Sequence, residues 1–340
     1  MGTETPAHSA QLRLVGESRT SPRENKQGKI CYADVFRLTD LPEVMEKMGW
    51  RNSAALMKKW FANPGYTMTL GQKKGVIPAS QYPSHLLETS LITMEWALSF
   101  PRIKREYDYM FGSRNLYKSI PPLYESPQAK QLLVKRLFRA KKFTNLPERF
   151  GDLTSSALVQ DEKWQFQRYT VDDNREYVNA WWKDSTKGDP DLDDMWGALA
   201  RFVFKIAGEG TVTPKTKVIK SGGEHSVQVE HYEINVSRIG VYIRDTYDFN
   251  GDQYLGHWSK NSPPYIRVYQ LSYVAGGRGE KGSCPDDFVS VTNERFSSHR
   301  QATGCGGDLI VLSDVLVTTL KKPFKFRVTP QEIANISRAE

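Results

Sequence analysis

Three consecutive stretches decide the fold: TVTPKTKVIK (residues 211–220), SVQVEHYEINV (226–236) and RIGVYIRDTYDF (238–249). Their apolar residues recur with the period of two that is typical of β-strands, and Gly222-Gly223 predicts a turn between the first two. Further strands are predicted for PYIRVYQLSYV (264–274), DLIVLSDVLV (308–317) and FKFRV (324–328). Residues 210–340 are therefore expected to form a β-rich region with a mostly antiparallel, curved sheet.

The chain before these strands has helical signals. Residues 1–29 are polar and lack periodicity, and we expect a disordered tail there. Residues 30–209 are expected to be helix-rich, which makes the whole chain an α+β protein. The predicted helices cover EVMEKMGW (43–50), SAALMKKWF (53–61), Leu86–Phe100, Ala129–Phe143 and MWGALARFVFKIA (195–207).

The composition excludes two classes of protein. The chain has 340 residues, of which 39% are hydrophobic and 25% charged, so it is not disordered throughout. No run approaches the roughly 18 apolar residues of a membrane-spanning helix.

The first 29 residues lack the apolar segment of a signal peptide, so we expect synthesis in the cytoplasm without a cleaved leader. The three cysteines, Cys31, Cys284 and Cys305, fit neither a disulfide framework nor a zinc site.

The excess of positive charge is local. Of the net charge of +8, all is accounted for by residues 101–150, which hold 12 basic and four acidic residues. Such a block indicates an anionic partner. The basic helix 129–143 would either lie on an anionic membrane or be the solvated side of a core helix. Nucleic acid is an unlikely partner because no recognition helix, RNA-binding motif or zinc finger is present.

The densest cluster of chemical groups follows the strand 238–244. Asp245, Tyr247, Asp248 and His257 lie within thirteen residues of one another. Two nearby carboxylates can bind Mg²⁺ or serve as acid and base, and His257 could transfer a proton. In the alternative interpretation, Asp245 and Asp248 cap a turn while Tyr247 packs in the core. A calcium-binding EF-hand is excluded, because Gln253 and Ser259 occupy the positions that need Gly and Glu.

A second cluster spans residues 293–308. Arg300 is a candidate phosphate ligand because its planar fork matches phosphate oxygens. Gly304, Gly306 and Gly307 precede a predicted strand, but no GK[ST] sequence or helix follows, so the segment is not a P-loop. The alternative is a structural hairpin in which Arg300 pairs with a carboxylate.

The chain from about residue 30 resembles an uncharacterised bacterial family associated with type VI secretion loci. The matching stretches are GWRNSAALMKKWF, ITMEWALSFPR, GVYIRDTYDFN with LGHW, and HRQATGCGGDLIVLSDV. The resemblance implies an antibacterial effector that is secreted and acts in the periplasm of a target cell. An immunity protein and a secretion-spike component would be its partners.

A narrower similarity is to the colicin M-type bacteriocins, which cleave lipid II and carry the motif D-x-Y-D-x5-H-R. Asp245, Tyr247 and Asp248 match its first part. Position 254 is Tyr, the nearest histidine is His257, and the His-Arg pair stands at 299–300. This similarity implies a lipid-linked pyrophosphate as substrate.

The resulting hypothesis is a Mg²⁺-assisted phosphoester hydrolase. Asp245 and Asp248 would bind the metal or act as base, Tyr247 would position the phosphate, His257 would protonate the leaving group and Arg300 would neutralise the pyrophosphate. The alternatives are a membrane-disrupting effector, a secretion-spike adaptor and a nuclease. The enzyme requires these side chains to meet in one cleft, so segments 245–258 and 299–308 should lie close together. The adaptor predicts scattered side chains and an exposed apolar patch.

Overall fold

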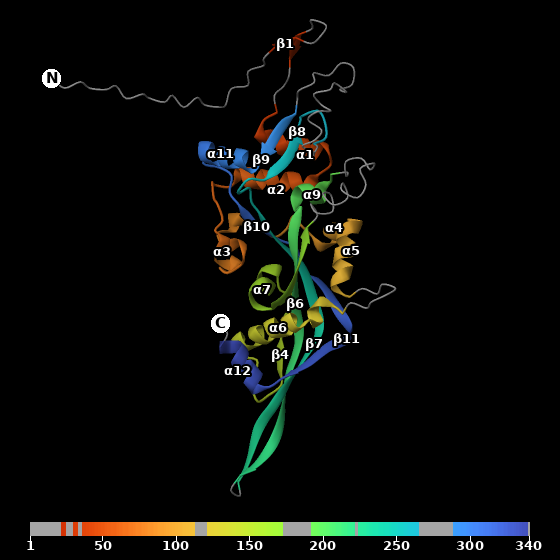
Figure 1. Cartoon of the computed structure of the whole chain (residues 1–340), viewed down its shortest axis with the longest axis vertical. Coiled ribbons are helices and arrows are strands. Elements are labelled where there is room, and N and C mark those ends of the chain that lie inside the picture. Colours follow the sequence, from red (N-terminus) through yellow and green to blue (C-terminus); the bar gives the residue numbers. More distant parts are fainter. Residues whose placement is uncertain are drawn as a thin grey trace, which may run out of the picture.

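The computed structural model describes residues 22–24, 30–32, 36–112, 121–172, 192–221, 224–264 and 288–338. The α+β prediction is confirmed: helices dominate the first part of the chain and a mostly antiparallel sheet dominates the second (Figure 1). Of the predicted tail, only β1 (Pro22–Glu24) lies among the described residues, and it pairs with β2 (Ile30–Tyr32).

The other elements follow in chain order. The helices are η1 (Leu38–Asp40), α1 (Leu41–Lys47), α2 (Arg51–Ala62), α3 (Leu70–Lys73), η2 (Ala79–Gln81), η3 (Ser84–Leu86), α4 (Met94–Leu98), α5 (Pro101–Met110), η4 (Leu123–Glu125), α6 (Pro127–Arg139), α7 (Ala157–Lys163), α9 (Asp194–Ala198), α11 (Asn293–Thr303) and α12 (Pro330–Arg338). The strands are β3 (Leu87–Glu88), β4 (Glu148–Phe150), β5 (Gln165–Asp172), β6 (Arg201–Ser221), β7 (Glu224–Tyr247), β8 (Tyr254–Trp258), β9 (Val289–Thr292), β10 (Leu309–Leu312) and β11 (Leu316–Val328).

Three of the predicted helices form close to where the sequence places them. Helix α1 has Pro42 in its first turn, where the missing N–H costs nothing. Helix α2 covers the predicted 53–61 and buries Trp60 on its inner face. Helix α6 begins at Pro127 after the cap Ser126, whose hydroxyl accepts a hydrogen bond from the Ala129 N–H.

Two predicted helices are wrong over most of their length. The predicted helix 86–100 is reduced to α4, because residues 87–88 form β3 and pair with β10. The predicted helix 195–207 ends as α9 at Ala198. From Arg201 the chain is β6, in which Phe202, Phe204 and Ile206 alternate into the core. The apolar residues of this stretch fit both a helical and a period-two spacing, and in the structure the period-two spacing of a strand is the one adopted.

The second site segment also differs from its prediction. Residues 293–303 form α11 rather than a hairpin arm, and Gly304 ends this helix in the left-handed conformation. The predicted strand 264–274, the turn at Gly222-Gly223 and Cys284 lie outside the described residues. Cys305 is a free, exposed thiol.

The main sheet is built around β7. The strand order is β3-β10-β7-β6-β4, with β11 also paired to β7 and β5 also paired to β6. All these pairs are antiparallel except β10 with β3. Strands β8 and β9 form a separate antiparallel pair. The long β6–β7 hairpin therefore connects every other part of the main sheet.

Both faces of the sheet are covered. On β7, Val241 and Ile243 point into the larger core, which also contains Trp60 of α2. Tyr242 points to the opposite face and into a smaller core with Leu86. The larger core contains residues from both the helix-rich region and the β-rich region, so these two regions fold as one body.

Strands β6 and β7 extend beyond their neighbours. Pairing of β6 with β4 stops at Val212, and pairing of β7 with β11 stops at Tyr232. Beyond these residues, within the described part of the chain, the two strands pair only with each other, from Lys215↔His231 to Ser221↔Glu224. We call this two-stranded part, residues 215–221 and 224–231, the ribbon. It projects from the lower end of the molecule (Figure 1).

Candidate functional site

The two segments that the sequence singled out lie next to each other. Strand β10 pairs with the end of β7, so that Val311 lies opposite Asp245 and Leu309 opposite Tyr247. The Asn293 N–H, at the start of α11, also donates to the Gln253 carbonyl at 2.9 Å. The expectation that residues 245–258 and 299–308 are close is therefore confirmed.

A buried carboxylate, Asp308, organises this region. It has no exposed surface, and it accepts hydrogen bonds from Arg300 Nη2 at 2.6 Å and Asn250 Nδ2 at 2.8 Å. It also accepts one from the Met68 N–H at 3.0 Å. We call Asn250, Arg300 and Asp308 the clasp. It ties together the end of β7, helix α11 and the loop before α3.

The guanidinium of Arg300 is committed within the clasp. Besides Asp308, its Nε donates to the Gly306 carbonyl at 2.5 Å and its Nη1 to the Thr67 hydroxyl. Its plane lies 5.3 Å from the ring centre of Trp60. A guanidinium group with this many of its N–H donors already bonded has few donors left for a phosphate. Of the two sequence-based interpretations, the geometry favours pairing with a carboxylate.

A close backbone approach keeps the clasp in place. Gly306 has φ +103°, and a Cβ there would lie 2.5 Å from the Trp60 ring. Only glycine fits this position without displacing the indole. The glycine-rich turn thus serves packing against α2, which is a structural use of the pattern.

Asp248 and Asp245 leave the sheet in different directions. Asp248 forms an ion pair with Lys73 at the end of α3 and accepts from Asn250 Nδ2 at 2.9 Å. Asp245 is partly buried beside the larger core, and none of the described side chains donates to its carboxylate. Burial, together with the charge of Asp248, raises the pKa of Asp245 to about 7, although the Thr246 N–H and Arg244 oppose this shift.

Tyr247 and His257 have other surroundings. Tyr247 is buried, its hydroxyl lies 3.9 Å from Met57 Sδ, and burial raises its pKa. His257 lies on β8, opposite Ser290 of β9, and its Nδ1 contacts the Tyr254 hydroxyl. Burial lowers the pKa of His257 and so disfavours its charged form. Of the five predicted residues, Asp248 and Arg300 share a hydrogen-bonded network through Asn250.

The arrangement does not favour the predicted Mg²⁺ site. Asp248 already faces the Lys73 ammonium group, and a cation would have to displace it. Burial of Asp245 disfavours its charged form, which is the form that binds a cation. In the part of the chain that the structure describes, no three His, Cys, Asp or Glu side chains gather into a group that could hold a metal ion.

Sequence reasoning missed a buried charged cluster on the other face of the sheet. Asp161 of α7 accepts from the Tyr242 hydroxyl at 3.0 Å and lies 3.3 Å from Lys205 Nζ and 3.2 Å from Arg244 Nε. Arg244 also donates to the Lys73 carbonyl at 2.8 Å. Burial lowers the pKa of Lys205. In the sequence, this cluster could have been found from Tyr242 and Arg244, which lie on the same face of the strand at the end of the apolar run 239–243.

Much of the basic block is neutralised within the molecule. Arg102 pairs with Asp193 at 2.7 Å, Lys104 with Asp108 at 2.5 Å and Lys142 with Glu148 at 3.2 Å. Arg136 donates to the carbonyls of Glu162 and Gln165 at 2.6 and 2.9 Å. Helix α6 buries Leu133 and Leu137 and is thus a core helix with a solvated basic side.

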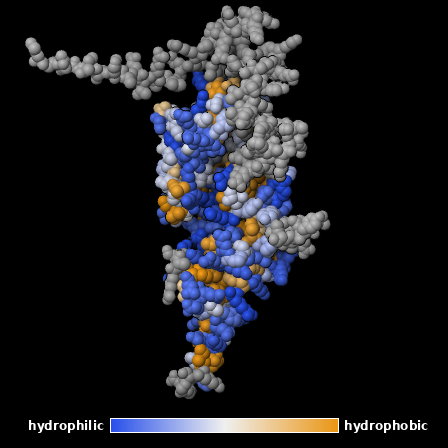
Figure 2. All heavy atoms as spheres, in the orientation of Figure 1, coloured by the Kyte–Doolittle hydropathy of each residue, from blue (hydrophilic) through white to orange (hydrophobic). Residues whose placement is uncertain are grey.

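Exposed apolar side chains occur in pairs on the ribbon and near α3, and singly elsewhere, as at Leu146. On the ribbon, Val218 and Val227 are opposite one another and are 62% and 71% exposed. Near α3, Leu70 and Val76 are 65% and 75% exposed. Figure 2 shows apolar surface toward the projecting end of the hairpin. The adaptor hypothesis calls for a sizeable exposed apolar patch, and Val218 and Val227 are the strongly exposed apolar residues of the ribbon.

Comparison with known proteins gives a family but no activity. No helix among the described residues is long and apolar enough to cross a membrane. No curated protein and no solved structure matched the chain. The model of DUF6402, a family of unknown function, matches residues 36–328, and the chain therefore belongs to that family.

Proposed function

We propose that this protein is an adaptor that binds an extended segment of a partner protein through the ribbon. Among the hypotheses raised by the sequence, this is the non-enzymatic one, in which the partner is a component or cargo of a secretion apparatus. The observation that carries the proposal is the exposed Val218–Val227 pair on two strands that no other strand covers.

The two faces of the ribbon differ in chemistry. Lys217 and Glu230 lie on one face, 4.0 Å apart, and neutralise each other. Val218, Val227 and Val229 lie on the other face, according to the register of the strands. A two-stranded ribbon is marginally stable in water, and exposed valines make no contribution to its core. A partner that covers the valine face would supply the missing burial.

The edges of the ribbon offer hydrogen-bonding groups to the same partner. Neither neighbouring strand can continue along it, because Pro147 directly precedes β4 and Pro330 follows β11. The outward N–H and C=O groups beyond Val212 and Tyr232 therefore have no strand partner among the described residues. An extended peptide that adds a strand to the ribbon would bond to these groups. Every second side chain of that peptide, if apolar, would contact the valines.

A second copy of this chain fits the ribbon less well. Among the described side chains, the valine face offers three valines, Thr216 and His225. Side chains of this size cannot supply the roughly 800 Å² per partner that a stable interface buries. A partner that adds a strand gains main-chain hydrogen bonds as well as apolar contact.

Site-specific photo-crosslinking in the producing cell tests the proposal. A benzophenone side chain at Val218 should give one dominant protein adduct, and the same group at Gln228, on the polar face, should not. Val229→Lys should abolish the adduct. Equal adducts from both faces, or none from Val218, would contradict a docking role for the valine face.

The phosphoester hydrolase remains a second candidate, which one observation favours. Asp245 has a pKa of about 7, which suits a general base or acid at neutral pH, and Asp248 is close enough to contribute to that shift. In this hypothesis the substrate is a lipid-linked pyrophosphate and Asp245 is the acid–base group. Mg²⁺ would require Lys73 to leave Asp248.

Expression in a sensitive bacterium separates the candidates. Lysis that depends on export to the periplasm, and that an immunity protein suppresses, would support the hydrolase. Killing from the cytoplasm with degraded nucleic acid would support a nuclease. An adaptor should be harmless in both compartments.

A further inference from the structure

A cavity of about 400 Å³ lies between the start of α6 and the irregular part of β11. Its lining comes from η4 and α6 and, far away in sequence, from β11: Glu125, Lys130, Lys322, Pro323, Phe324 and Lys325. The register of β11 against β7 shifts between Thr319 and Phe324, so the chain bulges outward and forms one wall. This cavity is separate from the clasp and from the ribbon.

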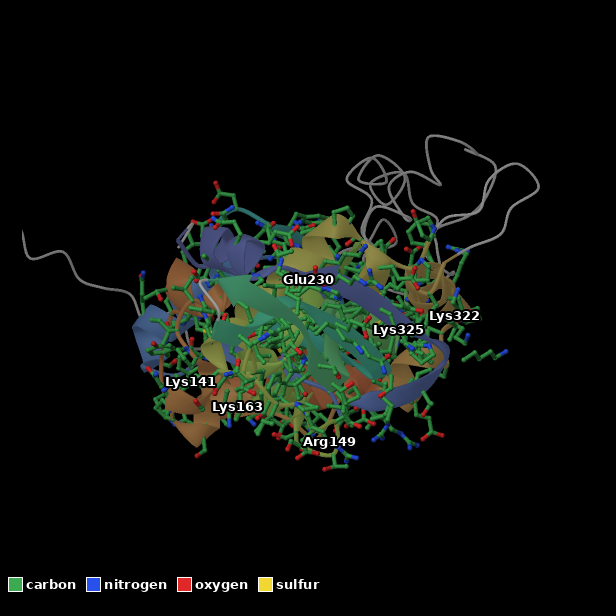
Figure 3. The ribbon with its side chains drawn as sticks, turned by 90° about the horizontal axis from the view of Figure 1, so that it is seen from below. Lys141, Arg149, Lys163, Glu230, Lys322 and Lys325 are labelled. Atoms are coloured by element: carbon green, nitrogen blue, oxygen red, sulfur yellow. The ribbon has the colours of Figure 1, made fainter. Side chains whose placement is uncertain are left out.

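The cavity is strongly positive for its size. Three ammonium groups face a single carboxylate, which leaves a formal charge of +2. None of the three lysines forms an ion pair with a carboxylate of the described residues, whereas Arg102, Lys104 and Lys142 of the basic block each do. Figure 3 shows Lys322 and Lys325 close together on one side of the molecule.

Aromatic rings place one of these cations. Lys130 Nζ lies 5.7 Å from the ring centre of Phe324 and 6.0 Å from that of Phe326. A cation over an aromatic face keeps its charge without a counter-ion. Phe324 is almost fully buried and lines the cavity as a rigid apolar surface. The site therefore combines unneutralised charge with a fixed apolar wall, the composition of a small-ligand pocket.

We propose that this cavity binds a phosphate group. The formal charge of +2 matches a phosphate monoester or a pyrophosphate better than a carboxylate, which carries a single charge. Lysine ammonium groups bind phosphate as point charges and tolerate several geometries, which suits side chains from two elements. The phosphate belongs either to a soluble ester or to a lipid headgroup, and both present the same oxygens.

Titration of the full chain with sodium pyrophosphate tests the soluble ligand. The double variant Lys322→Gln/Lys325→Gln should weaken binding at least about tenfold, which corresponds to about 1.4 kcal/mol. Lys321→Gln is the matched control, because Lys321 is an exposed neighbour that does not line the cavity. It should change the affinity less than about threefold, since exposed charges act weakly at a distance in salt.

Sedimentation with vesicles tests the lipid source. Binding to vesicles of phosphatidylcholine with phosphatidylglycerol, but not to pure phosphatidylcholine, would assign the phosphate to a headgroup. That binding should be lost in the double variant and kept in Lys321→Gln. Binding of pyrophosphate alone would assign it to a soluble ester.

One result would overturn the proposal. Lysines and a proline on a bulged edge strand can also prevent pairing with other chains. In that case the double variant would self-associate, as measured by light scattering, and its binding of pyrophosphate and of vesicles would equal that of the wild type. Absence of wild-type binding to both probes would overturn it as well.

Discussion

The clasp and the ribbon stand at opposite ends of the same two long strands, and they use polar and apolar residues in opposite ways. In the clasp, polar groups are buried and each one described has a partner. In the ribbon, the apolar side chains of Val218 and Val227 are exposed and are not packed into a core. Arg300, which the sequence singled out, is thus tied into the fold, whereas Val218 and Val227 remain exposed.

The largest expected effect is on the clasp. Asp308→Ala should lower the free energy of unfolding by about 3–5 kcal/mol, because it leaves Arg300 almost buried without its counter-ion. Chemical denaturation followed by circular dichroism measures this. A loss below about 1 kcal/mol would mean that the clasp does not hold the fold together and that Arg300 is available for a ligand.

The next effect concerns pH. The pKa of Asp245 is raised from 3.8 to about 7 in the folded state, so the folded protein holds this proton more tightly than the unfolded chain. The resulting stabilisation is present below pH 3.8 and is lost as the pH rises toward 7. Asp245→Asn should therefore raise stability at pH 8, by up to roughly 4 kcal/mol at 1.36 kcal/mol per pKa unit.

Two outcomes of that experiment are informative. Urea denaturation at pH 5 and pH 8 should show a smaller difference for Asp245→Asn than for the wild type. If both proteins lose the same stability between these values, Asp245 is not the group that titrates. If the variant is more stable but a measured hydrolase activity disappears, the buried carboxylate of Asp245 lowers stability and is required for catalysis.

Asp248→Asn should have a small effect on stability. Its pair with Lys73 is partly exposed, so the loss should be about 1 kcal/mol or less. Asp252→Asn, on an exposed turn, is the control and should be silent. A drop in hydrolysis or toxicity of about 10²-fold or more in Asp248→Asn, without a change in folding, would restore its catalytic role. Unchanged activity would leave it a structural pair.

The smallest effect on stability belongs to the ribbon. Val218→Lys with Val227→Lys removes two exposed side chains that touch no core, so the free energy of unfolding should change by about 0.5 kcal/mol or less. Thermal unfolding measures this. A loss of several kcal/mol would show that the valines support the fold, and the contrast with the clasp would disappear.

The sequence allowed the class of the fold to be predicted because period-two alternation over residues 226–249 has no helical alternative. The stretch 195–207 was misread because Phe202, Phe204 and Ile206 fit either period, and only their place beside β7 decides between them. Arg300 was found as an unusual residue, but its role depends on contacts with Thr67, which is distant in sequence, and with the buried Asp308, which in turn accepts from the Met68 N–H. The cavity at Phe324 joins elements almost two hundred residues apart and had no sequence signal.

The continuity of β6 and β7 has a mechanical consequence. The hydrogen bonds of antiparallel strands lie perpendicular to the strands. A pull on the ribbon along its own length would therefore load the bonds of β7 to β10 and β11 in shear, all at once and not one after another. The body of the molecule should resist such a force while the ribbon transmits it. A pull applied through a partner bound to the ribbon would therefore leave the main sheet folded.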